Sequence, residues 1–210
     1  MNFLIACDQA YYDDWGHELL RSIQWHNPWL KLHCHIVNPQ NRKKGLTYVD
    51  YTTEIKEFTS ESNRLGYLQA VRFLAVAEKF KDEDLVMTTD ADTICTRPII
   101  NQHYQEVCSQ VNILTHQKHG GWLCGLVTYG QGSFKRDYAD ALKSKPVEEW
   151  QVGHDQLILP NLQDKHRFRI LDKKWMSIGK HRDSSAFFTL KGNDRNNKNF
   201  RAAYESFLIQ

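Results

Sequence analysis

The sequence of 210 residues predicts an α/β fold with a mostly parallel central sheet flanked by helices. The first observation is an alternation of short apolar runs with segments of helical periodicity through the first ninety residues. Because parallel strands need crossover connections, this alternation is typical of a parallel sheet. The second observation is Asp90-Ala91-Asp92, which directly follows an apolar run at 85–89. Ligands collect at the carboxyl ends of strands in such sheets, so the position of this acidic pair suits the fold.

Each element of the first half has its own signal. Asn27-Pro28 ends the first helix, strand-like alternation precedes Asn38-Pro39, and Ser60 or Ser62 is a candidate N-cap for a long helix. The apolar face of that helix contains Leu65, Leu68, Val71, Arg72, Ala75, Val76 and Phe80. The elements are a strand at 3–7, a helix at 11–26, strands at 30–37 and 46–51, a helix at 60–80 and a strand at 85–89.

The second half is less regular. We expect strands at 111–115, 122–127 and 168–171, helices at 131–143, 155–162 and 200–208, and a polar loop at 192–199. No internal repeat or linker interrupts the chain, so we expect one domain over residues 1–210. Its two halves are residues 1–95, which end in the acidic motif, and residues 96–210.

Composition indicates an ordinary globular protein, with 41% apolar and 25% charged residues and a formal net charge of +2. Residues 151–210 carry 11 Lys or Arg and 6 Asp or Glu, an excess that could face phosphate or nucleic acid or be plain surface chemistry. The five cysteines have no metal-binding spacing, which favours a reducing, cytoplasmic location. No signal peptide or membrane-spanning segment is expected.

Two carboxylates at the end of a strand suit a divalent cation, because Mg²⁺ and Mn²⁺ prefer oxygen ligands. Asp90 and Asp92 are therefore the predicted metal ligands. Asp82-Glu83-Asp84 has the same spacing but leads into the strand, so we interpret it as a solvated turn. His33 and His35 point to one face of a strand, where no acidic partner is expected nearby.

Several segments, in order along the chain, resemble one family. They are Ala6-Cys7-Asp8 with Tyr11, the helical segment that contains Arg72, Asp90-Ala91-Asp92, Trp122-Leu123-Cys124-Gly125, His154-Asp155-Gln156, and Thr189 to Arg195. From about residue 3 to residue 195 the chain looks like a glycosyltransferase of the GT-A fold. It is most similar to the retaining group that includes glycogenin and bacterial lipooligosaccharide galactosyltransferases.

The resemblance implies a role for each matched residue. Asp8 and Tyr11 would contact the nucleotide base, Arg72 and Asp90 the diphosphate, and Gly192 and Arg195 a phosphate. Asp90 and Asp92 would hold Mn²⁺ or Mg²⁺. Asp155 would bind sugar hydroxyls and Gln156 would lie near the anomeric carbon.

The residues themselves leave other interpretations open. Asp8 could cap the next helix, and Asp155 could do the same or act as a general base in an inverting enzyme. Arg72 stands among apolar neighbours, where its charge needs a phosphate or a carboxylate such as Asp90, or it extends to solvent.

The chain departs from the family at two positions. Thr189 replaces the histidine that supplies the third metal ligand, and His154, His181 and Asp183 are candidates for that role. Leu123 replaces a polar asparagine beneath the donor sugar, which leaves the sugar preference open.

The sequence thus predicts a metal-dependent glycosyltransferase that moves a hexose from a nucleotide sugar, a UDP-sugar by preference, to an acceptor hydroxyl with retention. Its expected partners are that donor and a glycan or other hydroxyl acceptor, without nucleic acid. The alternatives are a non-catalytic nucleotide-sugar or nucleic-acid binding protein on the same fold, a D-x-D phosphatase and a nucleotidyltransferase. The last would need a basic glycine-rich loop where Asp13 and Asp14 stand.

Overall fold

A computed structural model describes residues 1–40, 45–108, 113–118, 121–170, 172, 174–178 and 185–189, with side chains except at 113–118 and 121–124. The described strands of the larger sheet lie in the order β3-β2-β1-β4-β7-β6-β8. They are β1 (Asn2–Asp8), β2 (Lys31–Val37), β3 (Val49–Glu54), β4 (Val86–Thr89), β6 (Ile113–Lys118), β7 (Gly121–Tyr129) and β8 (Phe168–Ile170).

The pairing confirms the predicted mostly parallel sheet. Strand β1 pairs in parallel with β2 and β4, and β2 pairs in parallel with β3. Strand β7 runs antiparallel to both of its neighbours, β4 and β6, while β6 is parallel to β8. The order of the strands reverses at β1 and β4, so a crevice is expected beyond the carboxyl ends of these two strands.

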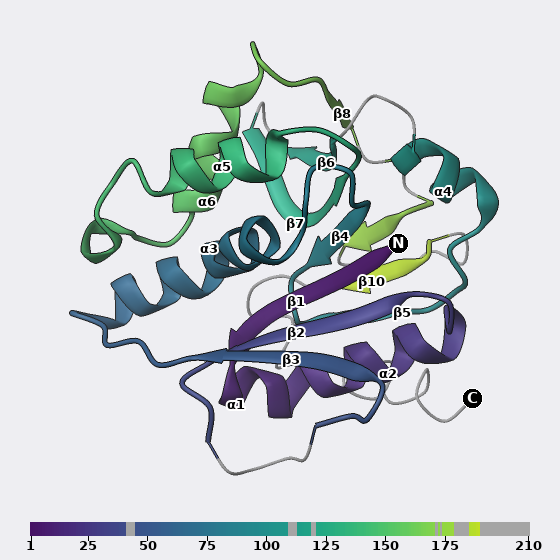
Figure 1. The fold of residues 1–210 in the computed structure, drawn as a ribbon, viewed down its shortest axis with the longest axis horizontal. Helices are drawn as coiled ribbons and strands as arrows, with labels where there is room; N and C mark the ends of the chain where they lie inside the picture. The colour runs from purple at the N-terminus through teal and green to yellow at the C-terminus, as the bar shows by residue number, and fades with distance from the viewer. Residues whose placement is uncertain are drawn as a thin grey trace.

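Helices cover both faces of this sheet (Figure 1). One face carries α3 (Glu61–Lys79), α5 (Phe134–Leu142) and α6 (His154–Ile158), and it buries a cluster that includes Val71, Phe73 and Trp150. The other face carries α2 (His17–His26), which buries Leu19, Leu20 and Ile23. Short helices α1 (Gln9–Tyr11), η1 (Tyr12–Gly16), α4 (Asn101–Cys108), η2 (Val147–Glu149) and η3 (Leu159–Leu162) complete the described elements.

A smaller sheet was not predicted. It has the order β5-β10-β9, with β5 (Thr93–Cys95), β10 (Phe187–Thr189) and β9 (Met176–Ile178). Its strands have three residues each, too short for periodicity to reveal. Strand β5 follows Asp90-Ala91-Asp92, which therefore forms the turn that connects the two sheets. The turn is closed by a hydrogen bond of 3.2 Å from the Thr93 N–H to the Asp90 carbonyl.

Other boundaries differ from the sequence prediction. The short strand expected at 46–51 lies at Val49–Glu54, and helix α4 was not expected. The first helix was predicted as one segment, but it includes a π-helical turn between α1 and α2. Ser60 is the N-cap of α3, because its hydroxyl accepts from the Asn63 N–H at 3.1 Å. The helix expected at 200–208 and the loop at 192–199 lie outside the described residues.

Candidate active site

A cavity of about 540 Å³ lies where the carboxyl ends of β1 and β4 meet the N-terminal half of α3. It includes seven of the residues that the sequence singles out: Asp8, Tyr11, Arg72, Asp90, Asp92, Asp155 and Gln156. Its other lining residues are Ala6, Cys7, Arg64, Leu65, Leu68, Gln69, Ala91, Gly125 and Val152. Residues more than 140 positions apart in the sequence thus share one cavity.

Asp8 uses both of its carboxylate oxygens. Oδ1 accepts from the Tyr11 N–H at 2.8 Å, so the residue caps helix α1. Oδ2 accepts from Nη1 of Arg64 at 2.5 Å. Glu61 also binds the Arg64 guanidinium, at 2.8 and 2.7 Å. The hydrogen bond with Glu61 and the charge of Asp8 raise the pKa of Arg64, so its charge is balanced by two acids.

Arg72 lies at the floor of the cavity and is only 4% exposed. Its Nη1 donates to Oδ1 of Asp90, and its Nη2 lies 3.8 Å from Oδ2 of Asp155. Asp155 is 2% exposed. The buried guanidinium therefore pairs with carboxylates from two separate elements, as its apolar setting requires. The interpretation of Arg72 as a side chain extending to solvent is wrong.

Asp92 is buried beside two hydroxyl groups. The Tyr11 hydroxyl donates to Asp92 Oδ2 at 2.9 Å, and the Thr189 hydroxyl donates to the Asp92 carbonyl oxygen at 3.2 Å. Thr189 lies there because β10 pairs with β5 and sets it opposite Thr93. Thr189 is the residue that the resemblance aligns with the family's third metal ligand. It therefore lies at the acidic turn, where its side chain is a hydroxyl rather than an imidazole.

Asp155 and Gln156 are held in place by the loop that precedes them. The Gly153 N–H donates to Oε1 of Gln69 on α3 at 2.8 Å, and Gly153 has a φ of +85°, which favours glycine. A Cβ on Gly66 would lie 2.6 Å from the carbonyl carbon of Gln151. Helix α3 therefore packs directly on this loop and sets the position of α6.

The formal charge of the cavity is negative. Four carboxylates line it, those of Asp8, Asp90, Asp92 and Asp155, against two guanidinium groups, those of Arg64 and Arg72. The formal charges of these six described lining residues sum to −2. A cation that entered together with an anionic ligand would reduce its repulsion from this lining.

The acidic turn suits a divalent cation in its ligand chemistry. Asp90 and Asp92 both line the cavity, and each carboxylate has a second oxygen besides the one that accepts from Arg72 or Tyr11. Within the part of the chain that is described, no group of three or more His, Cys, Asp or Glu gathers as a metal site. His154 stacks on Trp150 and its Nε2 lies 3.3 Å from the Leu142 carbonyl, so it does not face the turn.

Four of the predicted residues lie outside the described residues. Gly192 and Arg195 were assigned to phosphate binding, and His181 and Asp183 were candidates for the third metal ligand. Leu123 lies on β7, but its side chain is not described. Gly125 does line the cavity, and its carbonyl accepts from the Asp90 N–H at 3.1 Å.

Sequence reasoning missed Arg64, Gln69 and Val152, and it assigned Leu65 and Leu68 to an apolar core face. One signal could have placed the two leucines correctly. Leu65, Leu68 and Arg72 follow the spacing i, i+3, i+7, so they share a stripe of the helix with a charged residue that needs a site. The structure puts this stripe on the cavity, and Leu65 is 39% exposed.

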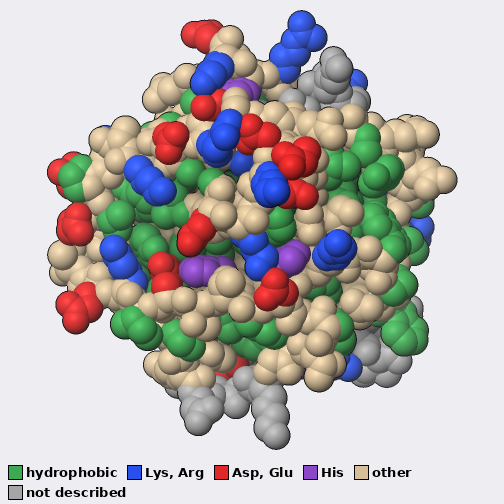
Figure 2. Space-filling model, viewed as in Figure 1, with side chains coloured by type: hydrophobic (Ala, Val, Ile, Leu, Met, Phe, Trp, Pro, Cys, Tyr) green, Lys and Arg blue, Asp and Glu red, His purple; other side chains and the backbone are tan. Residues whose placement is uncertain are grey.

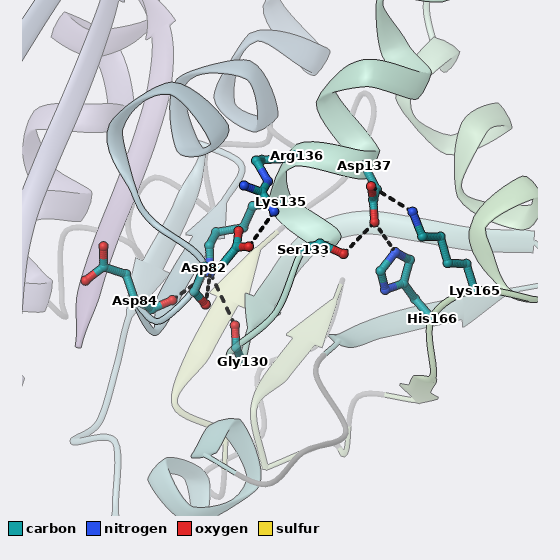
Figure 3. Close-up of polar contacts among 9 residues, drawn as sticks. All are labelled: Asp82, Asp84, Gly130, Ser133, Lys135, Arg136, Asp137, Lys165 and His166. Atoms are coloured by element: carbon teal, nitrogen blue, oxygen red, sulfur yellow. Dashed lines mark hydrogen bonds and ion pairs between the residues drawn. The ribbon is translucent and has the colours of Figure 1, made fainter.

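The second acidic pair is a structural turn, as predicted (Figure 3). The ammonium group of Lys135 donates to the carbonyl oxygens of Asp82, Asp84 and Gly130, at 3.3, 2.8 and 3.3 Å. The Asp82 carboxylate pairs with Arg136 at 2.5 Å. Asp82 and Asp84 therefore attach α5 to the turn that precedes β4. They contact Lys135 and Arg136, whereas Asp90 and Asp92 line the cavity, although both pairs have the same spacing in the sequence.

The histidine pair on β2 has partners that were not expected. His33 Nδ1 lies 3.3 Å from Asp50 Oδ2, and His35 Nε2 lies 3.4 Å from Glu54 Oε1. Both acids lie on β3, whose parallel register with β2 sets Asp50 opposite His33. The expectation that no acid is nearby is wrong, and the histidines belong to cross-strand pairs. A second histidine pair, His116 and His119, precedes Gly120-Gly121 in the sequence, but its side chains are not among those described.

No family model matches this chain, and a search of the curated proteins finds no match. Solved structures do match, each over 100% of this chain. An active-site mutant of LgtC, in which glutamine is replaced by glutamate, has a TM-score of 0.67 at 12% identity, with 94% of that chain covered. The galactosyltransferase LgtC in complex with donor and acceptor sugar analogues has a TM-score of 0.66 at 13% identity, again with 94% covered.

A third structure is the apo form of the glycosyltransferase GlyE from Streptococcus pneumoniae TIGR4, with a TM-score of 0.65 at 14% identity. This chain covers 60% of it. Together with the strand order, these likenesses define the fold as that of GT-A-like glycosyltransferases. The fold prediction is confirmed.

Two surface properties complete the description. On the face seen in Figure 2, Lys and Arg side chains interleave with Asp and Glu side chains, so this face presents no continuous basic track. Among the described helices, none combines the length and the apolar character that crossing a bilayer requires.

Proposed function

We propose that the protein is a metal-dependent glycosyltransferase that moves a hexose from a nucleoside diphosphate sugar to an acceptor hydroxyl. The preferred donor is a UDP-sugar and the stereochemistry is retaining. In the reaction, the bond between the anomeric carbon and the diphosphate oxygen breaks. The acceptor oxygen forms the new bond at that carbon, and the acceptor proton leaves.

One observation carries the proposal. A single cavity at the switch point of the sheet collects the acidic turn, a buried arginine, and the Asp155-Gln156 pair from three separate elements. The glycosyltransferase fold supports this assignment, since LgtC, which has the same fold, was solved with donor and acceptor sugar analogues. A cavity that served packing alone would not need a buried guanidinium with two carboxylates beside it.

The base end of the donor is assigned to β1 and α1. Tyr11 lines the cavity next to Asp8, and its ring offers a stacking surface. Asp8 already pairs with Arg64, so a base N–H would share that carboxylate with the guanidinium. The diphosphate is assigned to Arg72, with Gly192 and Arg195 as further predicted contacts.

Asp90 and Asp92 would hold the divalent cation, which when bound neutralises the charge that builds on the departing nucleoside diphosphate. The negative charge of the cavity supports this part of the proposal, because a diphosphate alone would add to it. Arg72 holds Asp90, and Tyr11 holds Asp92, so both carboxylates are oriented by the protein itself.

Asp155 is assigned to the sugar hydroxyls and Gln156 to the region of the anomeric carbon. Both line the cavity. The Asp155 carboxylate lies 3.8 Å from Arg72, and carboxylate oxygens can accept hydrogen bonds from sugar hydroxyl groups. LgtC has an active-site glutamine, which one solved structure replaces by glutamate, and this supports the assignment of Gln156.

The test is titration calorimetry with UDP and with GDP, each with and without Mn²⁺. We expect UDP to bind at least tenfold more tightly with Mn²⁺, and Asp92→Asn to abolish this gain. Asp82→Asn, in the second acidic pair, is the matched control and keeps it. Binding that needs no metal, or equal metal dependence in Asp92→Asn, would contradict the proposal.

Release of UDP from UDP-glucose or UDP-galactose then separates an enzyme from a binding protein. Metal-dependent binding without any release would favour the non-catalytic alternative. Hydrolysis of p-nitrophenyl phosphate would indicate a phosphatase instead. Binding to DNA or RNA that weakens steeply with salt would indicate a nucleic-acid binding protein.

A further inference from the structure

The mouth of the cavity differs in character from its floor. The floor carries Arg72, Asp92 and Asp155, which are 4%, 2% and 2% exposed. At the mouth, Leu65 and Val152 also line the cavity but are 39% and 56% exposed. Two exposed apolar side chains thus border the same cavity as the buried charged residues.

These two side chains belong to one continuous rim. Leu65 precedes Gly66 and Val152 follows Gln151, and the Gly66 backbone lies directly against the Gln151 backbone. Leu65 is on α3, and Val152 is in the loop that leads to α6. We call Leu65 and Val152 the apolar rim. Its two residues come from segments that are more than 80 positions apart but are packed together.

The charges at the mouth argue against an anionic group there. Arg64 is the cation nearest to Leu65 in sequence, and it is bound by both Asp8 and Glu61. These three residues have one net negative charge between them. Among the described residues, this part of the mouth therefore offers an incoming ligand apolar surface and no excess of positive charge.

We infer that the acceptor carries an apolar group beside the hydroxyl that it presents, and that Leu65 and Val152 bind this group. The inference rests on the proposed function, because it takes the floor as the site of sugar transfer. The occupant is the acceptor, because the proposed function already assigns the donor to other lining residues, its base to Tyr11, its diphosphate to Arg72 and its sugar to Asp155. Leu65 and Val152 are then left for the acceptor. Burial of exposed apolar surface is the source of the affinity.

The test compares n-octyl with methyl β-D-glucopyranoside, and n-octyl with methyl β-D-galactopyranoside, below the micellar concentration and with UDP and Mn²⁺ present. We expect the octyl compound of at least one pair to bind ten times more tightly or better. Because each buried methylene contributes severalfold, two buried methylenes suffice for this ratio. Leu65→Ser combined with Val152→Ser should bring the ratio close to one.

Leu157→Ser is the matched control. Leu157 is on α6 and is 71% exposed, but it does not line the cavity, so its replacement should leave the octyl preference unchanged. Equal binding of octyl and methyl compounds overturns the inference. A preference that persists in the rim variant, or that disappears in Leu157→Ser, also overturns it.

Two further measurements identify other occupants of the rim. If the rim substitutions lower the free energy of unfolding, the side chains are packed within the protein and the inference fails. If they dissociate a dimer in sedimentation, the occupant is a second copy of the chain and the inference also fails.

UDP binding is measured on every sample. Its absence in the wild type would refute the proposed function, whereas its presence without an octyl preference refutes only the inference.

Discussion

Arg72 on helix α3 binds the carboxylate of Asp90 at the end of β4, and it is the only guanidinium among the described cavity residues that is buried. The pair joins the helix to the acidic turn. The same guanidinium lies 3.8 Å from Asp155 on α6. One side chain therefore lies next to two of the carboxylates that line the cavity.

Replacement of this guanidinium should be costly. Arg72→Met leaves two carboxylates near each other, one of them almost fully buried, so we expect a loss of about 3–5 kcal/mol in the free energy of unfolding. Arg64→Met removes a half-exposed guanidinium from the same helix and should cost less than about 1 kcal/mol. Urea denaturation measures both. Similar losses for the two variants would show that Arg72 is not the buried charge described.

Gly66 should not tolerate a methyl group. Alanine would gain about 1 kcal/mol from its helix propensity, but the new Cβ would lie 2.6 Å from the Gln151 backbone. Because backbone atoms cannot rotate away, we expect a net destabilisation of about 1–3 kcal/mol. The displaced loop carries Val152 and Gly153, so UDP binding by Gly66→Ala should weaken as well. A stabilised variant would contradict the close approach of α3 to this loop.

Lys135 should be important for stability although it lies far from the cavity. Burial lowers the pKa of its ammonium group, which is held by three carbonyl oxygens (Figure 3). Lys135→Met removes one donor from each of these carbonyls, of which that of Asp82 still accepts from the Gly132 N–H, and should cost about 1–3 kcal/mol. Lys145, whose side chain is exposed, is the control, and Lys145→Met should change stability by less than about 0.5 kcal/mol. Thermal or urea unfolding distinguishes them.

Asp137 should contribute stability that depends on pH. Burial alone would raise the pKa of this carboxyl, but hydrogen bonds from Ser133, Lys165 and His166 lower it to about 2. Since the folded pKa lies below the ordinary value of 3.8, the contribution is present above pH 4 and is lost as the pH falls toward 2.

The difference in stability between wild type and Asp137→Asn should therefore shrink over this interval. The exposed Asp164→Asn is the control and should show no such trend. A difference between wild type and Asp137→Asn that stays constant from pH 7 to pH 2 would rule out the linkage.

Apolar runs, helical periodicity and capping residues in the sequence predicted most of the larger sheet and its helices. The strand that ends at Asp8 is a continuous apolar run, and the helix that Ser60 caps has a helical apolar pattern. Both signals can be read from neighbouring residues in the sequence. The smaller sheet could not be predicted, because a strand such as Phe187–Thr189 is stabilised by its pairing with Thr93–Cys95 rather than by its own pattern.

The same distinction applies to the cavity. Asp90 and Asp92 could be proposed because they directly follow an apolar strand, and Asp155 because its segment resembles one of the family's elements. Arg64 could not, since a surface arginine three residues after a glutamate is ordinary in a helix, and only the tertiary structure brings it to Asp8. Val152 was missed for a related reason, because its role depends on the contact between Gly66 and Gln151.

The pairing of β10 with β5 has a consequence for synthesis of the chain. Thr189 completes the surroundings of Asp92, yet it follows Asp92 by 97 residues. A nascent chain can form β1 to β4 long before β10 leaves the ribosome, so the acidic turn is made early and enclosed late. The side chains that hold the two carboxylates, Tyr11 and Arg72, precede the turn in the sequence, so only the backbone contact of Asp92 with Thr189 waits for the end of synthesis.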